Sequence, residues 1–376
     1  MDPLVIDVFD ALGYPMFRLP YTSCNWSDTI NDPGSLNVDV TYTTTTMKVP
    51  KGLYNQLKLW GVILAAHRLD EQTNTEIVTH AGPLEDYNWD APNRKLSLSC
   101  GGGWSALTKR LALNHSLDIS WLDGDILIDE EHPAGAWALT LTGSYSDIMR
   151  GLVNESMQWG ALPITLPTPE GGTQTITYNG YDLATVASLL DDLTKLADGN
   201  ELRFDPRIQA NGTLTFDMRS QPEINDHQWL EGTELGAWDS TVPGQRVVFA
   251  GVSGKGAAMT NQVFAIGGKS GDKTVVARVT QKNQPNILQS ADKTHTTIVD
   301  LKQLRQYAQS GIAYGSYPDE TFKVRVGDEY PVRPGDWADL KVEDDFMGEQ
   351  LLKLKVTDVD GSDSNDWLDI QARLRG

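Results

Sequence analysis

Residues 35–46 read SLNVDVTYTTTT, and this stretch decides the fold class. From Leu36 to Thr46, every second side chain is apolar, aromatic or β-branched, and those between Leu36 and Tyr42 alternate with polar neighbours. A period of two residues is typical of a β-strand that buries one face and leaves the other in solvent. The abundance of Val and Thr adds to this preference. The stretch therefore predicts one long, half-buried strand.

Further strand-like segments and turns surround this stretch. Strands are expected at Leu57 to Ile63, at Ile77-Val78 and at Leu96 to Leu98, and turns at Asp32-Pro33-Gly34, Pro50-Lys51-Gly52 and Pro92-Asn93. Gly, Pro and Asn close short turns, and short turns join antiparallel strands. We therefore predict that residues 1–110 hold an N-terminal segment and an antiparallel β domain without a convincing helix.

The pattern changes after Cys100, and residues 111–232 are expected to form an α+β module. Helices are predicted near 105–113, from Ser146 and from Asp182, short strands at 117–128, and a hairpin at Asn211-Gly212. Leu183, Val186 and Leu190 fall on one face of the helix that starts near Asp182. The Asn-Gly pair is the strongest short-range signal for a β-hairpin.

A second β domain is predicted over residues 233–376, after an acidic connector at 231–243. Strands are expected from Arg246 and at 322–326, 337–342, 352–359 and 367–374. The polar, Gly-rich stretch 255–297 and a helix over 300–315 interrupt this series. They predict an inserted subdomain near 255–315. The fold class is therefore mainly β with an α+β insertion.

Composition and charge exclude several classes of protein. The chain has 376 residues, of which 40% are hydrophobic and 22% charged, so it is globular and large enough for two or three domains. Lys and Arg number 31 against 51 Asp and Glu, which gives a net charge of −20. Phosphate binding needs clustered Lys and Arg, so this charge argues against a protein that binds nucleic acid or anionic membranes.

The cysteines and the N-terminus indicate a soluble protein made in a reducing compartment. Cys24 and Cys100 are too few for a disulfide scaffold and are expected to be buried thiols. The start MDPLVIDVFD lacks the basic region of a signal peptide. The longest apolar stretch, Val62 to Ala66, is far shorter than the ~20 residues of a membrane span. No membrane anchor is expected.

No motif for catalysis, a cofactor or a metal emerges. The six histidines have no zinc-ligand spacing, and we expect them to be structural or exposed. Gly251 to Gly256 has neither dinucleotide nor phosphate-loop spacing and is expected to be a flexible loop. The acidic stretch 358–366 departs from a calcium loop and predicts a hairpin turn. Gly101 to Gly103 indicates close approach of backbones. We therefore predict a protein that is not an enzyme, with no catalytic, cofactor or metal-ligating residues.

The 11 tryptophans are spread through all three regions of the chain. They include Trp60, Trp104, Trp121, Trp137, Trp159, Trp238, Trp337 and Trp367. A cleft for sugars would gather such residues in one module, so the scatter favours roles in cores and interfaces.

A series of segments resembles a known family in its order along the chain. The segments are PYTSCNWSD (20–28), GSL (34–36), KLSLSCGGGW (95–104), KR (109–110), GALPI (160–164), YNGYD (178–182), ELRFDP (201–206), VFAG (248–251), the 300–315 helix and VRPGDW (332–337). Together they resemble the minor tail proteins of long-tailed (siphovirus) phages, specifically the Gp37-like tail-tip or baseplate hub proteins of phages of actinobacteria. The resemblance covers roughly residues 15–376.

This resemblance implies a homotrimeric structural protein of the virion. Each chain would hold two tube-like antiparallel β-barrels, at about 20–110 and 233–376, joined by the α+β module. Three chains with two barrels each would adapt a six-fold tail tube to a three-fold tail tip. DNA would pass through the channel during ejection without specific binding, repelled by an acidic wall.

The resemblance also implies partners and a location. The partners would be the tail tube or distal tail protein, the tape measure protein and further tail-tip proteins. The protein would be made in the host cytoplasm and end in the phage tail tip. Because the sequence stops at Gly376, after the last predicted strand, any peptidoglycan-cleaving or host-binding extension is expected on another polypeptide. Two alternatives stay open: a carbohydrate-binding adhesin that uses exposed Trp, and a peptidoglycan-degrading tail protein that uses paired carboxylates.

Overall fold

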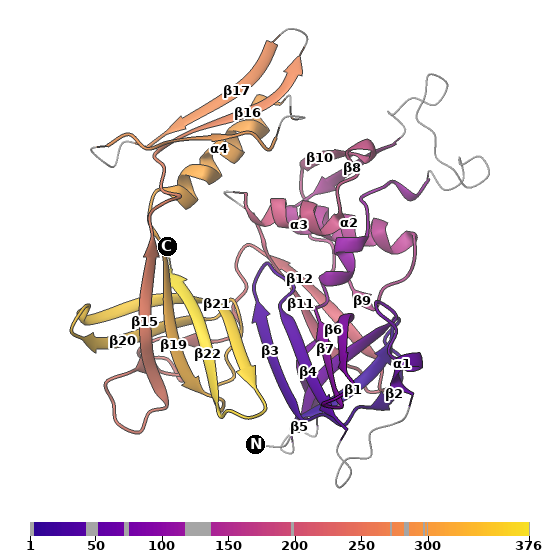
Figure 1. Cartoon of the computed structure of the whole chain (residues 1–376). Helices are drawn as coiled ribbons and strands as arrows, with labels where there is room; N and C mark the ends of the chain where they lie inside the picture. Colours follow the sequence, from indigo (N-terminus) through magenta and orange to yellow (C-terminus); the bar gives the residue numbers. More distant parts are fainter. Residues whose placement is uncertain are drawn as a thin grey trace.

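The structure is a computed structural model. It describes residues 4–42, 52–70, 75–116, 137–196, 199–270, 273–281, 286–295, 298 and 300–375. The chain is mainly β, as the sequence predicted (Figure 1). Its largest element is a sheet of 14 strands that the N-terminal and C-terminal parts of the chain build together.

The first half of this sheet comes from the N-terminal 100 residues. Its strands are β1 (Val5–Asp10), β2 (Pro15–Arg18), β3 (Ser23–Thr29), β4 (Ser35–Thr41), β5 (Val62–Asp70), β6 (Thr75–Asp90) and β7 (Lys95–Cys100). They lie in the order β3-β4-β7-β6-β5-β1-β2, and every pair is antiparallel. The antiparallel β domain predicted from the alternation in β4 is present, and the end of that pattern, 43–46, lies outside the described residues.

The predicted strand at Leu57 to Ile63 is wrong in its first part. A short helix, α1 (Leu53–Gln56), and a turn precede strand β5, which begins only at Val62. Leu53 and Leu57 are nevertheless buried, because the helix turns them into the core of this half. Burial thus explains the apolar pattern that the sequence analysis interpreted as a strand.

Strand β5 explains how the first half is fixed in the molecule. Val62, Leu64 and Ala66 face the core of this half, while Ile63 and Ala65 face a second core shared with the α+β module. A strand covered on both faces has a continuous apolar sequence rather than an alternating one. The first half is therefore buried on both sides at its centre.

The second half comes from the C-terminal part of the chain. Its main strands are β15 (Val247–Lys255), β19 (Asp319–Gly327), β20 (Trp337–Asp344), β21 (Gly348–Ser362) and β22 (Trp367–Leu374). The four predicted strands after residue 320 are confirmed. Strand β21 pairs antiparallel with β3 and so joins the two halves into one sheet.

Two expectations for this half are wrong. The acidic connector at 231–243 contains β14 (Trp238–Asp239), which, like β13 (Gln228–Trp229), pairs parallel with β20 and buries Trp238. The expected flexible loop from Gly251 lies largely in β15, where a bulge after Phe249 brings Gly251 into register with Lys323. Both segments are ordered by pairing with strands far along the chain, which local composition does not reveal.

The two expected β-barrels are not confirmed. The order of strands runs from β15 at one edge to β2 at the other, and among the described residues no pairing closes either half on itself. Each half nevertheless has its own buried core. In the described residues, the 14-stranded sheet is therefore open, and each of its halves has a core of its own.

The α+β module lies beside the first half in Figure 1. It contains η1 (Ser105–Lys109), β8 (Ala138–Gly143), α2 (Tyr145–Gln158), β9 (Ile164–Thr165), β10 (Gln174–Asn179), η4 (Gly180–Asp182), α3 (Val186–Thr194), β11 (Glu201–Ile208) and β12 (Leu214–Gln221). The hairpin at Asn211-Gly212 is confirmed. The predicted strands at 117–128 lie outside the described residues.

The helices of this module begin where side chains cap them. Helix α2 starts after Ser144, which forms a reciprocal capping box with Asp147. Helix α3 begins at Val186, later than the predicted Asp182, because the Thr185 hydroxyl caps it by accepting from the N–H of Ser188. Leu183 lies outside the helix with a φ of 51° and is exposed.

The insertion predicted near 255–315 has a sheet and a core of its own. Strands β16 (Gln262–Ser270), β17 (Lys273–Thr280) and β18 (Gln289–Asp292) form this sheet, and α4 (Leu301–Gly315) packs on it. Leu304 and Ala308 of α4 share this core with Ala265 and Ala277 of the sheet. Figure 1 shows the insertion above the second half.

Candidate functional site

A dense contact between the two halves and the α+β module is the candidate site; we call the group Asn31, Gly102, Arg203 and Asp336 the joint. Gly102 follows strand β7, and a Cβ there would lie 1.9 Å from the carbonyl oxygen of Pro33. A Cβ on Gly82 of β6 would lie 1.7 Å from the carbonyl oxygen of Gly101. Only glycine fits at either position, so the glycine run marks the close approach of backbones that the sequence predicted.

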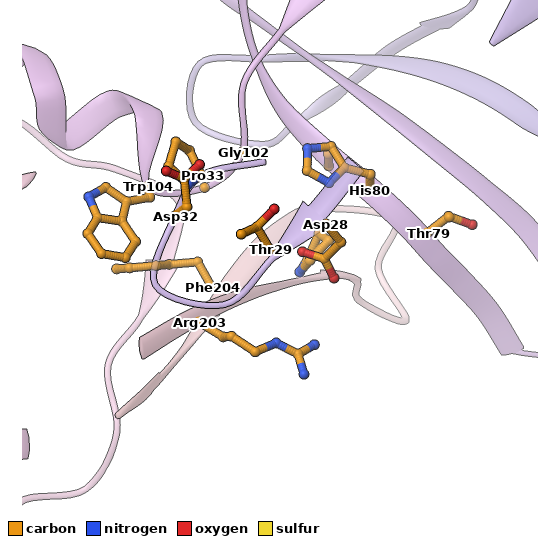
Figure 2. Close-up of a pocket in the computed structure, with 13 residues that line it drawn as sticks. Asp28, Thr29, Asp32, Pro33, Thr79, His80, Gly102, Trp104, Arg203 and Phe204 are labelled. Atoms are coloured by element: carbon orange, nitrogen blue, oxygen red, sulfur yellow. The ribbon is translucent and has the colours of Figure 1, made fainter. Parts of the chain in front are cut away.

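A small polar cavity lies behind this loop (Figure 2). The buried His80 lines it, with Nε2 3.1 Å from the carbonyl oxygen of Gly101. Burial lowers the pKa of His80, and the charge of Asp28 and the Gly101 carbonyl oppose this only in part. The cavity measures about 20 Å³, which is room for a water molecule and not for a substrate.

Arg203 on β11 fastens the module to the second half. Its guanidinium is buried, and Nη1 donates to the carbonyl oxygen of Pro334 at 2.9 Å. Nη2 donates to Asp205 at 2.6 Å, and Asp226 lies 3.4 Å from Nη1. A buried guanidinium needs such partners because it cannot lose its charge.

Asp336 holds the opposite side of this contact. The residue is fully buried in the turn before β20. Its Oδ1 accepts from the backbone N–H groups of Asp226 and His227, at 3.0 and 2.9 Å. Its Oδ2 accepts from the N–H of Arg333 and lies 2.9 Å from His227 Nδ1. Four hydrogen-bonding groups thus compensate the carboxylate for the water it has lost.

Asn31 links the first half to the same module. Its backbone N–H donates to the carbonyl oxygen of Leu202 at 3.1 Å, and its side-chain oxygen accepts from the N–H of Leu202 at 2.7 Å. Its φ of 61° is a left-handed conformation that Asn tolerates better than most residues. Nearby, the Ile30 N–H donates to the carbonyl oxygen of Thr357 on β21. The joint therefore connects all three regions through buried polar contacts.

No site residue was predicted from the sequence, and the joint was not anticipated. Arg203 and Asp336 fall within ELRFDP and VRPGDW, two segments that carried the family resemblance, but nothing local marked them as partners. The one signal in the sequence was the position of these charges: Arg203 lies inside an apolar strand, and Asp336 lies directly before another strand. Such charges are buried only when paired.

The candidate metal and histidine positions have structural partners. The stretch 358–366 forms the end of β21 and a turn to β22, as predicted, and Asp363 accepts from the N–H of Cys24. His67 bonds to Asp7 and Glu76, and His115 to Glu155. In the ranges that the structure describes, no group of three or more His, Cys, Asp or Glu side chains could hold a metal ion. His132 lies outside these ranges.

Both cysteines are buried free thiols, as the sequence predicted. Burial and the charge of Asp363 raise the pKa of Cys24 to about 12, and burial also raises the pKa of Cys100. Thiols in such surroundings are inert. Among the described residues, no helix is long and apolar enough to cross a membrane.

Two larger hollows lie on the surface. One, beside α1, has a volume of about 540 Å³ and a mostly apolar wall that includes Tyr54 and Trp89. The other, about 660 Å³, lies between β10, α3 and the start of α4, and its wall mixes polar and apolar groups. The volumes match those of ligand sites, but neither hollow contains a recognisable catalytic pair.

Comparison with known proteins identifies solved structures that have a similar fold. The sequence matches no protein-family model and no curated protein. Three solved structures are similar over nearly their whole lengths. The 43 kDa tail protein of prophage MuSo2 from Shewanella oneidensis has a TM-score of 0.57 at 12% identity, with 100% of this chain and 98% of that chain covered.

The other two similar structures are also tail proteins. Prophage tail protein gp18 from Listeria monocytogenes EGD-e has a TM-score of 0.53 at 10% identity, with 98% and 94% covered. The tail protein from Neisseria meningitidis MC58 has a TM-score of 0.51 at 14% identity, with 100% and 97% covered. The chain shares the fold of phage tail proteins. The likeness to phage tail proteins that the sequence indicated is thus confirmed by these structures, whereas the two-barrel arrangement is not.

Proposed function

We propose that this protein is the trimeric tail-tip (baseplate) hub of a long-tailed phage, a structural virion protein without enzymatic activity. The observation that carries the proposal is the similarity to three tail proteins, two of them from prophages, over nearly the whole chain, both halves and the module included. Three copies with two β halves each would present six similar units to a six-fold tail tube. On this proposal the domains are 1–110, 111–232 and 233–376, and the two β halves act as tube-like barrels.

The joint supports a mechanical role. Arg203 and Asp336 connect the module to the second half through buried, charge-assisted hydrogen bonds, and Asn31 connects it to the first. Networks of this kind rigidify a structure when every member is satisfied. A subunit that transmits force between a tube and a tip needs its two halves in fixed positions.

The net charge supports a channel for DNA. A chain of charge −20 repeated three times would repel phosphates and let DNA pass without binding. We propose that acidic side chains face the pore. The neighbours on this proposal are the tube or distal tail protein, the tape measure protein and further tail-tip proteins, and the location is the virion tail tip after synthesis in the host cytoplasm.

Counting the copies per particle tests the proposal. Quantitative mass spectrometry of purified virions should find three copies of this chain, and immunogold labelling should place them at the end of the tail. A particle without the chain, a label on the capsid, or a count that is not a multiple of three would contradict the proposed hub.

One observation favours a second candidate, a carbohydrate-binding adhesin. Of the tryptophans named in the sequence analysis, Trp104, Trp137 and Trp238 are buried. Trp89, in contrast, is 46% exposed beside the hollow at α1. Exposed aromatic rings can stack on sugars. Glycan binding that Trp89→Ala abolishes would favour this candidate, and a glycan array without any signal would remove it.

A further inference from the structure

The strands β20 and β21 form a long hairpin whose tip carries the most exposed large apolar side chain among the described residues. Phe346 is 88% exposed there. The Asp344 carboxylate accepts from the backbone N–H groups of Phe346 and Met347, at 2.8 and 2.6 Å, and so fixes the turn. A phenyl ring is therefore held in solvent on a shaped tip.

Acidic residues surround this ring. Glu343, Asp344 and Asp345 precede it, and Glu349 follows on the returning strand. Glu343 lies directly opposite Glu349 in the hairpin register, a like-charge pair that destabilises an isolated hairpin. The neighbouring Lys341 offsets this repulsion in part, with its Nζ 3.5 Å from a carboxylate oxygen of Glu349. The tip is thus an anionic surface that a cationic, apolar partner surface would stabilise.

The hollow beside α1 has the complementary properties. It has a volume of about 540 Å³, and its described lining is mostly apolar, with the aromatic rings of Tyr54, Tyr87 and Trp89. The one charged residue in this lining is the cationic Arg94. The Nζ of Lys58 lies 5.8 Å from the ring centroid of Tyr54 and adds a second positive charge. The hollow accommodates a phenyl ring and attracts acidic neighbours.

The tip and the hollow lie at opposite ends of the molecule. Figure 1 shows the β20–β21 hairpin extending to the left of the second half and α1 at the right of the first half. A tip and a hollow that cannot meet within one chain can meet between two copies. Such a contact is head to tail, and head-to-tail contacts close into rings when the rotation permits.

We propose that Phe346 at the hairpin tip of one copy inserts into the hollow beside α1 of a second copy. The inference rests on the proposed hub, because it assigns the contact that closes the ring. Arg94 of the second copy then faces the acidic tip of the first. When the contact is repeated, first and second halves follow one another in alternation around the ring.

Cysteine cross-linking tests the contact in the full chain. Cys24 and Cys100 are buried and unreactive, so any intermolecular disulfide must form between the introduced cysteines. The double variant Phe346→Cys with Tyr54→Cys should form covalent dimers and trimers under oxidation, and each single variant should form neither. The matched control pairs Tyr54→Cys with Leu351→Cys, a residue on the same hairpin that is 51% exposed and away from the tip. This control variant should form no covalent dimers or trimers.

Charge reversal gives an independent readout. In sedimentation equilibrium, Phe346→Ala or Arg94→Glu should weaken self-association by roughly ten-fold or more. Adding Asp345→Arg to Arg94→Glu should restore most of the association, because the charges are then exchanged. Rescue of this kind requires that the two residues face each other and excludes a folding defect as the cause.

The outcomes separate this contact from the hub itself. Trimers that form without the 346–54 cross-link and tolerate Phe346→Ala would overturn the contact and leave the hub intact. A chain that stays monomeric at all concentrations, without the cross-link, would also overturn it, while the copy count in virions still tests the hub. An oligosaccharide that binds the hollow with no effect of Phe346→Ala on association would overturn it in favour of the adhesin.

Discussion

The first half of the sheet is held from both sides, whereas the second half leaves its longest hairpin in solvent. In the first half, Ile63 and Ala65 pack outward against the core of the α+β module. In the second half, the described core residues come from its own strands, from Val332 in the loop before β20 and from β13 and β14, and the β20–β21 hairpin ends in the exposed Phe346. The first half is thus anchored to the module by apolar packing, whereas the second half is anchored by the polar contacts of the joint and extends an exposed hairpin away from it.

The largest loss of stability is expected when the residue that the second half contributes to the joint, Asp336, is replaced. Asp336→Ala leaves three backbone N–H groups and His227 without their buried acceptor, so we expect a loss of about 3–5 kcal/mol in the free energy of unfolding. Urea unfolding monitored by Trp fluorescence measures it. Asp345→Ala, at the exposed tip of the same half, should change stability by under ~0.5 kcal/mol. Equal losses would contradict the contrast between joint and tip.

A second prediction tests close packing in the first half. Gly82→Ala would place a Cβ 1.7 Å from the carbonyl oxygen of Gly101, so the backbones must separate at a cost of about 1–3 kcal/mol. Gly256→Ala is the matched control in the second half, where the nearest atom is the sulfur of Met259 at 3.5 Å. That variant should be neutral or slightly stabilising. Thermal unfolding of both variants distinguishes them, and a tolerant Gly82 would mean that the strands are not so close.

A third prediction concerns pH and the buried His67. Burial lowers the pKa of His67, but its bonds to Asp7 and Glu76 raise it by more, so the net shift is upward. The ion pairs therefore contribute fully below pH ~6.5, and this contribution is lost as pH rises through the raised folded-state pKa. His67→Gln should cost about 1–3 kcal/mol at pH 6 and less at pH 9.

Urea titrations at the two pH values measure this difference. The ionisation of Asp7 sets the lower end of the pH range in which its ion pair with His67 stabilises the fold. Although burial raises its pKa, His67 and Arg18 lower it to about 2, so Asp7 stays ionised down to strongly acid pH. Its own contribution is present above pH ~3.8 and is lost as pH falls through about 2. His80 is the control: its pKa is lowered, so protonation at low pH should destabilise the fold instead. A cost of His67→Gln that grows with pH would contradict the ion pairs.

The smallest effect on stability is expected at the hairpin tip. Phe346→Ala removes a ring that the isolated chain exposes, so the free energy of unfolding of the monomer should change by under ~0.5 kcal/mol. Differential scanning calorimetry at low protein concentration tests this. A large destabilisation would show that Phe346 belongs to the core of its own chain and would remove the contrast between the two halves.

Local chemistry explains which elements were predictable. The β11–β12 hairpin and helix α2 were predicted because Asn211-Gly212 and the side chains around Ser144 favour them within a few residues. Helix α1 and strand β14 were missed because burial against distant strands, and not propensity, fixes Leu57 and Trp238. Pairing across the fold overrides local signals in these segments.

The candidate site was less predictable than the fold. Asp336 accepts hydrogen bonds from residues 226 and 227, and Arg203 donates to Pro334. Each contact joins segments more than a hundred residues apart, so no spacing within a motif encodes it. The triple glycine was the exception, because a run of three glycines after a strand is itself a sign of close approach.

Single-particle reconstruction of the tail end would show whether three chains form a ring. We predict three copies of this chain, whose six β halves alternate around an open pore with an acidic wall. A ring with any other copy number, halves arranged so that they enclose no pore, or a basic lumen would contradict it.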